Sequence, residues 1–305
     1  MQELMVYAGH LECYDRCNEV LERFLSIEVS AAQVYRVTNK VSESLIEEQD
    51  QTERLLSPIE KSDVLYAEMD GSMVCTREDG WKEVKLGRLF KGSDCLNPNS
   101  EHACLSQSQY VAQFGNSHTF GKRMEQVISA YGNLKHRLVF ITDGATWIRE
   151  WIADHYPCAV AVLDYYHACE HLHQFADTAF KERQQKELWC KEQKELMLDS
   201  MIDKVINNIM MTEAQEEQKL KLINYYGTNK HRMDYKNYRT MGCGIIGSGA
   251  IESAHRTVIQ KRMKLSGQRW SHQGIRNMLR LRVLSMNKQW YKIIEATKYP
   301  KTRAA

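Results

Sequence analysis

Apolar residues recur at helical spacing through the first 60 residues of the chain. One helical stripe is formed by Leu11, Val20, Leu21, Phe24 and Leu25. Ser30 stands where it would cap a second helix over residues 31–41, which carries valines on one face. Residues 27–41 therefore fit a helix-turn-helix whose second helix enters a DNA major groove. A helical pair that serves only for packing is the simpler interpretation.

Beyond Pro58 the pattern changes to short strands. The strands predicted in this region cover residues 64–69, 72–76, 81–90 and 110–114. Asp70 and Gly71 separate the first two, and the turn at Glu78-Asp79-Gly80 leads into alternating residues, as in a hairpin. Residues 91–107 are polar and are predicted to form a loop.

Strands and helices then alternate. The predicted segments are a helix over 120–131, a strand over 137–142, a helix over 147–155 and a strand over 158–163. A strand-helix-strand unit of this spacing implies a parallel pair with a crossover helix. An antiparallel meander followed by such a unit predicts an α/β fold with a mixed sheet and covering helices.

From Leu172 the composition shifts to Glu, Gln, Lys, Leu and Met, with no Pro or Gly before Gly227. This predicts an all-helical insertion. A glycine-rich stretch over 241–249 ends it, and helix is predicted again from Ile251 through Trp290. The expected organisation is a helical N-terminal region (1–60), a first part of the core (61–171), the insertion (172–240), and a returning core helix with a helical tail (241–305).

Charge is distributed unevenly along the chain. Residues 253–305 hold thirteen lysines and arginines and one acid, a net charge of +12, so residues 1–252 carry −10 of the total of +2. A basic block beside an acidic remainder suits a polyanion-binding face, and a solvated amphipathic helix pair fits it too. No apolar run is long enough for a bilayer and no export signal is present, so we expect no membrane association. Nine scattered cysteines then indicate reduced thiols and a cytoplasmic location.

Three carboxylates stand in positions that suit metal chemistry. Asp70 and Asp143 each end an apolar strand and precede a glycine, and Glu252 opens a basic helix after a glycine-rich break. Two-metal phosphoryl transfer needs converging oxygen ligands, because Mg²⁺ is a hard cation. Any one of these acids, taken alone, is more simply a turn or N-cap residue. The three together favour a paired Mg²⁺ (or Mn²⁺) site for phosphodiester chemistry.

Several ordered blocks of sequence carry a resemblance. They cover residues 69–71, 81–87, 142–148, 164–172, 225–226, 232–235, 247–253 and 262–271. In these blocks the chain resembles bacterial insertion-sequence transposases of the DDE, ribonuclease-H-like superfamily, specifically the Kra-type branch. The resemblance implies a ribonuclease-H-like core interrupted by an all-helical insertion, and DNA transposition by cleavage at the transposon ends followed by strand transfer from the 3′-hydroxyl.

The resemblance also implies roles for individual residues. Asp70, Asp143 and Glu252 would be the catalytic metal ligands for two Mg²⁺ or Mn²⁺ ions. Asp164 and His167 match a polar-x-x-His element that follows the second catalytic acid in related transposases, and we interpret them as auxiliary. Asp164 also ends an apolar strand, so it competes with Asp143 for the second position.

The basic tail fits a DNA-binding role under this hypothesis. The residues expected to track phosphates and to stack on DNA are Arg256, Lys261, Arg262, Lys264, Arg269 and Trp270. The expected partners are double-stranded DNA, as terminal repeats and as target, and further copies of the chain in an oligomer assembled on DNA. The expected location is then the bacterial cytoplasm at the nucleoid.

Two other classes of function compete with this one. His167, Glu170 and His171 match H-x-x-E-H, the inverted zinc-peptidase motif, in which both histidines would bind Zn²⁺ and the glutamate would act as base. That interpretation leaves the basic tail and the Asp-Gly elements unexplained. The other alternative is a truncated, non-catalytic DNA-binding relic of a transposase.

Overall fold

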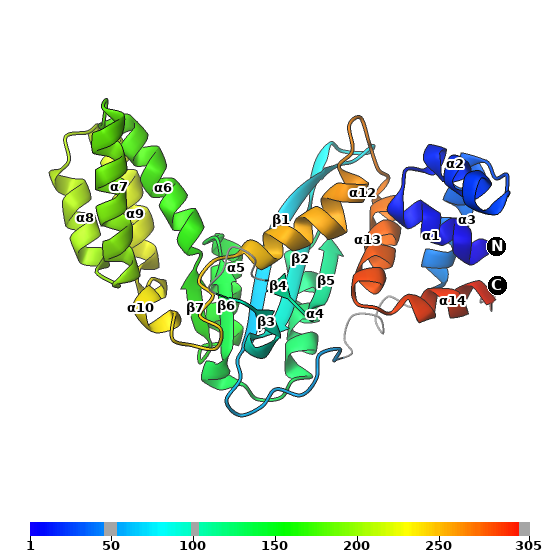
Figure 1. The fold of residues 1–305 in the computed structure, drawn as a ribbon, viewed down its shortest axis with the longest axis horizontal. Coiled ribbons are helices and arrows are strands. Elements are labelled where there is room, and N and C mark those ends of the chain that lie inside the picture. The colour runs from blue at the N-terminus through cyan, green and yellow to red at the C-terminus, as the bar shows by residue number, and fades with distance from the viewer. Residues whose placement is uncertain (46–53, 99–103, 299–305) are drawn as a thin grey trace.

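A mixed five-stranded sheet occupies the centre of the computed structural model, which describes residues 1–45, 54–98 and 104–298 (Figure 1). Its strands are β1 (Leu65–Cys75), β2 (Trp81–Lys91), β5 (Gln109–Phe114), β6 (Leu138–Thr142) and β7 (Val160–Leu163). The order is β5-β2-β1-β6-β7, with β1, β2 and β5 antiparallel and β6 and β7 parallel to β1. This arrangement confirms the predicted α/β fold with a ribonuclease-H-like mixed sheet.

Strand β1 is longer than the sequence pattern predicted. It runs unbroken from Leu65 to Cys75, so Asp70 lies within the strand and the predicted break at Gly71 is wrong. Gly71 pairs with Lys85 of β2, and a Cβ on Gly71 would lie 2.0 Å from a carboxylate oxygen of Glu83. Gly71 therefore lets the Glu83 side chain lie against the backbone of β1 beside Asp70.

The two faces of β1 explain why its sequence is nearly continuous in apolar residues. Leu65, Ala67 and Met69 pack on the face covered by α4 (Ser117–Ser129) and α5 (Thr146–His155). Even-numbered residues point to the opposite face, because side chains alternate along a strand. Glu68 and Asp70 therefore point toward the second helical layer.

That second layer contains α11 (Gly249–Ala254), a π-helical turn (His255–Gln260), α12 (Lys261–Met263) and α13 (His272–Met286). The helix predicted without a break over 251–290 is interrupted at 264–271. There Gly267 has a φ of +74°, and the backbone of Trp270 pairs with Thr76 just beyond β1. Figure 1 shows α11 and α12 running across the face of the sheet.

The helical insertion stands to one side of the sheet (Figure 1). Its helices are α6 (Tyr165–Ala179), α7 (Arg183–Leu198), α8 (Ile202–Met211), α9 (Glu216–Asn229) and α10 (Tyr235–Tyr238). Helix α6 begins directly after β7, so the boundary predicted at residue 172 falls inside a helix. The predicted loop over 91–107 contains a 3₁₀ turn (Gly92–Asp94) and two short paired strands, β3 (Cys95–Leu96) and β4 (Cys104–Leu105).

The N-terminal region forms α1 (Gln2–Leu11), α2 (Tyr14–Leu25) and α3 (Ala31–Ser44) at the opposite end of the molecule, beside α13 and α14 (Trp290–Lys298) (Figure 1). Ser30 caps α3 as expected, because its hydroxyl accepts a hydrogen bond from the Gln33 N–H at 3.2 Å. Residues 27–41 hold only one helix, α3, because the helix before it ends at Leu25, so the predicted helix pair is formed by α2 and α3 over residues 14–44. Its role in DNA binding stays a prediction.

Some predictions fall outside the described residues. These are the helical content of 46–53, the loop at 99–103, and the tail bases Lys301 and Arg303. Within the described part of the chain, no helix has the length and apolar character needed to cross a membrane.

Candidate functional site

Strand register brings three aspartates to one edge of the sheet. Glu68 of β1 pairs with Ile141 of β6, and Thr142 of β6 pairs with Leu163 of β7. Continuing these parallel registers places Asp70, Asp143 and Asp164 in adjacent positions. Neighbouring strands lie about 4.8 Å apart. The sheet therefore sets out these carboxylates in a row, with Asp143 between the other two.

A cavity of about 240 Å³ collects these aspartates and the predicted glutamate. Its lining consists of Met69, Asp70, Asp143, Asp164, Tyr166, His167, Glu170, Ser248, Ile251 and Glu252. All three predicted catalytic acids and both predicted auxiliary residues therefore meet at one place, although they come from separate elements.

Asp70 is half-buried and keeps one oxygen directed toward a histidine. Its Oδ1 accepts a hydrogen bond from the Gly71 N–H at 2.6 Å, and its Oδ2 lies 3.1 Å from Nε2 of His255. His255 is buried on the π-helical turn that follows α11. The histidine thereby links the strand-borne acid to the helix that carries Glu252.

Asp143 occupies the turn between β6 and α5. Its Oδ1 accepts a hydrogen bond from the Ala145 N–H at 3.0 Å, and its backbone carbonyl accepts one from the Tyr225 hydroxyl at 3.4 Å. Gly144 has a φ of +97°, which a residue with a side chain rarely adopts. The turn therefore holds the aspartate at the cavity wall, as well as starting α5.

Asp164 differs from these two because both of its oxygens are engaged within the fold. Oδ1 accepts hydrogen bonds from the backbone N–H groups of Tyr166 and His167, which caps α6. Oδ2 accepts a hydrogen bond from the hydroxyl of Ser248 in the glycine-rich segment. The side chain is 2% exposed. This geometry suits a positioning residue better than a metal ligand.

Two buried polar side chains hold the first turn of α11, which carries Glu252. Glu68 is fully buried and accepts a hydrogen bond from the Ile251 N–H at 2.6 Å. Arg88, its partner across the β1–β2 ladder, donates to the Ala250 carbonyl at 2.7 Å. Together they clamp the two residues immediately before Glu252 against the sheet.

The cavity concentrates negative charge. Burial raises the pKa of Glu252, and the neighbouring acids Asp164, Glu170 and Asp70 raise it further. Burial also raises the pKa of Glu68 to about 8. Carboxylates that repel one another in a shared site favour a bound cation. Asp70, Asp143 and Glu252 supply the hard oxygen donors that Mg²⁺ prefers, so the donor set fits the implied metal.

In this structure the carboxylates of the cavity do not converge on one point. Among the residues that the structure describes, no three His, Cys, Asp or Glu side chains are grouped closely enough to hold a metal ion as they stand. The fit therefore rests on the chemistry of the donors and on their shared cavity.

Sequence reasoning missed several residues of the site. Glu68, Arg88, Ser248 and His255 received no role, and Glu170 was considered only for a zinc site. Glu68 carried a usable signal, because it is the one charged residue within the apolar run over 64–69. Arg88 and His255 carried none, since only the sheet register and the path of α11 bring them to the site.

The predicted DNA-binding residues divide into two groups. Arg256, Lys261, Lys264 and Arg269 are exposed. Arg262 is 1% exposed, donates to the Gly9 carbonyl at 2.9 Å, and lies over the rings of Tyr14 and Trp270. Trp270 is itself buried, and its indole N–H donates to the Met263 carbonyl at 3.2 Å. Burial argues against direct DNA contact by Arg262 and Trp270, which instead join the N-terminal helices to the core.

The histidines of the H-x-x-E-H motif lie on one face of α6. Nε2 of His167 is 3.3 Å from Nε2 of His171, and Nδ1 of His167 is 3.3 Å from a carboxylate oxygen of Glu170. Glu170 thus faces the nitrogen of His167 that points away from His171. This arrangement does not place the glutamate where a peptidase base would act on a metal held by both histidines.

Comparison with known proteins leaves the function open. No curated protein matches the chain. A family model matches residues 2–298, nearly the whole sequence. The chain therefore belongs to the uncharacterised protein family UPF0236.

Proposed function

We propose that this protein is a DNA transposase that cleaves phosphodiester bonds at transposon ends with divalent metal ions and then transfers the freed 3′-hydroxyl strand. The observation that carries the proposal is the shared cavity of Asp70, Asp143 and Glu252 on a ribonuclease-H-like sheet. Mg²⁺ or Mn²⁺ bound there would activate the attacking hydroxyl and stabilise the leaving oxygen.

The chain's own residues would divide the work. Asp70 and Asp143, held by neighbouring parallel strands, would hold the metals from the sheet, and Glu252 would hold them from the helix above. Glu68 and Arg88 would keep α11 in register with the strands through their bonds to Ile251 and Ala250. His255 would orient Asp70 through the 3.1 Å contact. Asp164 and Ser248 would tie the glycine-rich segment to α6.

The exposed bases supply a route for DNA to the cavity. Arg256 lies one helical turn beyond Glu252, and Lys261, Lys264 and Arg269 follow it along the same segment. Exposed lysines and arginines bind phosphates irrespective of sequence and release counterions. We therefore propose double-stranded DNA as the partner of this surface, and assembly of several copies of the chain on it.

The direct test is cleavage of candidate transposon-end DNA by the purified chain. We expect strand cleavage with Mg²⁺ or Mn²⁺ that leaves a 3′-hydroxyl and stops when EDTA is added. Cleavage that continues in EDTA would contradict the proposal. So would intact DNA in both metals, which is the result expected of a non-catalytic relic.

A zinc peptidase is the second candidate, favoured by the 3.3 Å approach of His167 and His171. Metal analysis of protein purified without chelators separates the two. One tightly held zinc lost in His167→Ala supports the peptidase, whereas no retained zinc supports the transposase.

A further inference from the structure

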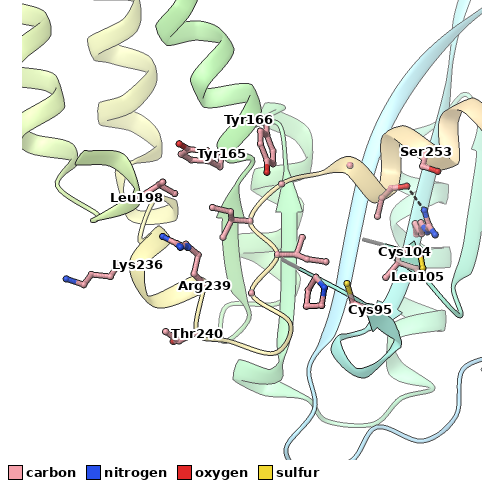
Figure 2. A pocket seen from close by; sticks show the side chains of 18 residues that line it. Cys95, Cys104, Leu105, Tyr165, Tyr166, Leu198, Lys236, Arg239, Thr240 and Ser253 are labelled. Carbon is pink, nitrogen blue, oxygen red and sulfur yellow. Dashed lines mark hydrogen bonds between the residues drawn. The ribbon is translucent and has the colours of Figure 1, made fainter. Parts of the chain in front are cut away.

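A second, larger cavity lies beside the catalytic one, on the side of the helical insertion. Its volume is about 1340 Å³, above the roughly 300–1,000 Å³ of ordinary small-molecule pockets. It extends from the start of α6 and the region of α10, along the glycine-rich segment over 244–250, to β3 and β4 (Figure 2). We call it the insertion-side groove. Its size fits a stretch of polymer better than a metabolite.

The charge of this groove has one sign. The described residues that line it include Arg88, Lys236 and Arg239 and no acid. Arg88 is engaged with the Ala250 carbonyl. The side chains of Lys236 and Arg239 are exposed, and within the described residues neither has an ion-pair or hydrogen-bond partner. Figure 2 shows both on the insertion side of the groove. Two unpaired cations beside an acidic cavity point to an anionic ligand that spans both places.

Tyr166 stands at the junction, because it lines both the groove and the catalytic cavity. The residue is 64% exposed. Its ring is nevertheless held in place: a Cβ on Gly247 would lie 2.3 Å from it, and Tyr165 meets it edge to face, with centroids 5.5 Å apart. An exposed aromatic ring that is fixed from behind is a stacking surface that needs no ordering when a ligand arrives.

We propose that the insertion-side groove binds the single strand of DNA that continues from the reacting phosphate, with its first base stacked on Tyr166 and its next phosphates on Lys236 and Arg239. The inference rests on the proposed function, since it takes the neighbouring cavity as the place of phosphodiester chemistry. A single strand is required because bases inside a duplex already stack on one another and leave no face for Tyr166. The DNA would therefore be unpaired at the site of cleavage.

Equilibrium binding in EDTA tests the groove separately from cleavage. The probes are a fluorescein-labelled blunt DNA hairpin and the same hairpin with a short oligothymidine extension, each titrated with the full chain. We expect the wild type to bind the extended hairpin more tightly. Tyr166→Ala should reduce that advantage about tenfold, since stacking one base on an aromatic ring has roughly that effect. Tyr166→Phe should retain it, because the ring is kept.

The double variant Lys236→Ala/Arg239→Ala tests the phosphate contacts. The slope of log affinity against log salt for the extended hairpin should fall by about 1.4, because each phosphate contact on a single strand contributes about 0.7. The matched controls are Tyr291→Ala, which removes an exposed tyrosine from α14, and Lys122→Ala, which removes an exposed lysine from α4 on the opposite face of the sheet. Neither should change the advantage of the extension.

Each outcome decides the proposal. Equal affinity of the wild type for both hairpins overturns it, even if the protein cleaves DNA. An advantage that survives in Tyr166→Ala and in the double variant overturns it as well. An advantage lost in both variants, with blunt-hairpin binding unchanged, supports it. The same pattern in a protein that fails to cleave DNA with any metal supports the groove while overturning the proposed nuclease.

Discussion

The acids on the sheet and the acid on the helix reach one cavity by different means. Asp70 lies in β1 and Asp143 directly follows the parallel neighbouring strand β6, so the strand register sets their spacing. Glu252 belongs to α11, whose first turn is held by bonds to the side chains of Glu68 and Arg88. The strand register therefore sets the positions of Asp70 and Asp143. The position of Glu252 depends on buried side chains contributed by other elements.

This difference separates robust from fragile parts of the site. A substitution on the surface of the sheet leaves the ladder and the register intact. A substitution at Glu68 or Arg88 removes a hydrogen bond on which the position of Glu252 depends, even though neither residue need touch substrate. Variants of the two groups should therefore fail in different ways.

The largest effect is expected from neutralising the acids themselves. Asp70→Asn, Asp143→Asn and Glu252→Gln should each lower metal-dependent cleavage roughly a thousandfold or more, because several kcal/mol of charge stabilisation are lost. Folding stability should not fall, since each change relieves repulsion among carboxylates. Cleavage rates and urea unfolding measure the two effects. Near-normal cleavage by the Asp70 or Glu252 variant would contradict the assignment.

The next largest effect concerns the far end of the segment that carries Glu252. Arg262→Ala should destabilise the fold by about 2–4 kcal/mol, because it loses a buried hydrogen bond to Gly9 and two ring contacts. Lys264→Ala, two residues away and exposed, is the matched control and should cost under about 0.5 kcal/mol.

The Arg262→Ala and Lys264→Ala variants also distinguish a packing role from a DNA-binding role. Lys264→Ala should reduce the salt dependence of duplex binding by about 0.9, as for one lost phosphate contact. If the Arg262→Ala variant folds stably and shows the same reduced slope, the result would support contact between Arg262 and DNA.

A moderate effect is expected from changing Glu68, which together with Arg88 forms the clamp on the first turn of α11. Glu68→Ala leaves the Ile251 N–H without its acceptor in a buried place, which should cost about 1–3 kcal/mol. Cleavage should fall as well, because α11 is no longer held. Glu68→Gln keeps an acceptor oxygen and should recover most of both losses. A Glu68→Ala variant that unfolds and cleaves as the wild type does would show that the clamp is dispensable.

The smallest effect is a dependence of stability on pH. Burial raises the pKa of Glu68 to about 8 from its ordinary 4.5. Between these values the folded state retains a proton that the unfolded state has released, so stability falls as pH rises through this window and levels off above it. Relative to Glu68→Gln, which stays neutral, the wild type should lose stability across the window. Urea midpoints that run parallel in both proteins would contradict this.

Much of the fold could be predicted from local pattern. The apolar strand over 138–142, the helix that follows it and the cap at Ser30 were all readable, because each depends on neighbours in the chain. The break predicted at Asp70-Gly71 was wrong for a physical reason. Glycine weakens an isolated strand, but here residues 65–75 pair with β2 along their whole length, and the Glu83 side chain lies over Gly71.

The candidate site was predictable only in part. Asp70, Asp143 and Glu252 stand next to glycines at the ends or breaks of apolar runs, and the cavity contains all three. Arg262 and Trp270 were assigned to DNA because a local pattern of bases and aromatics does not reveal burial. Their partners, Gly9 and Tyr14, lie about 250 residues earlier in the sequence, and only the packed N-terminal helices bring them together.

Binding of Mn²⁺ to the full chain, measured by titration calorimetry, tests the assignment of the acids most directly. Asp70→Asn, Asp143→Asn and Glu252→Gln should each weaken Mn²⁺ binding at least about tenfold, because each removes a charged ligand. Asp164→Asn should bind as the wild type does, since the Asn oxygen can still cap α6 and its NH2 group can donate to the Ser248 hydroxyl oxygen, which reverses that hydrogen bond. Lost binding in the Asp164 variant together with full binding in the Asp143 variant would contradict the account.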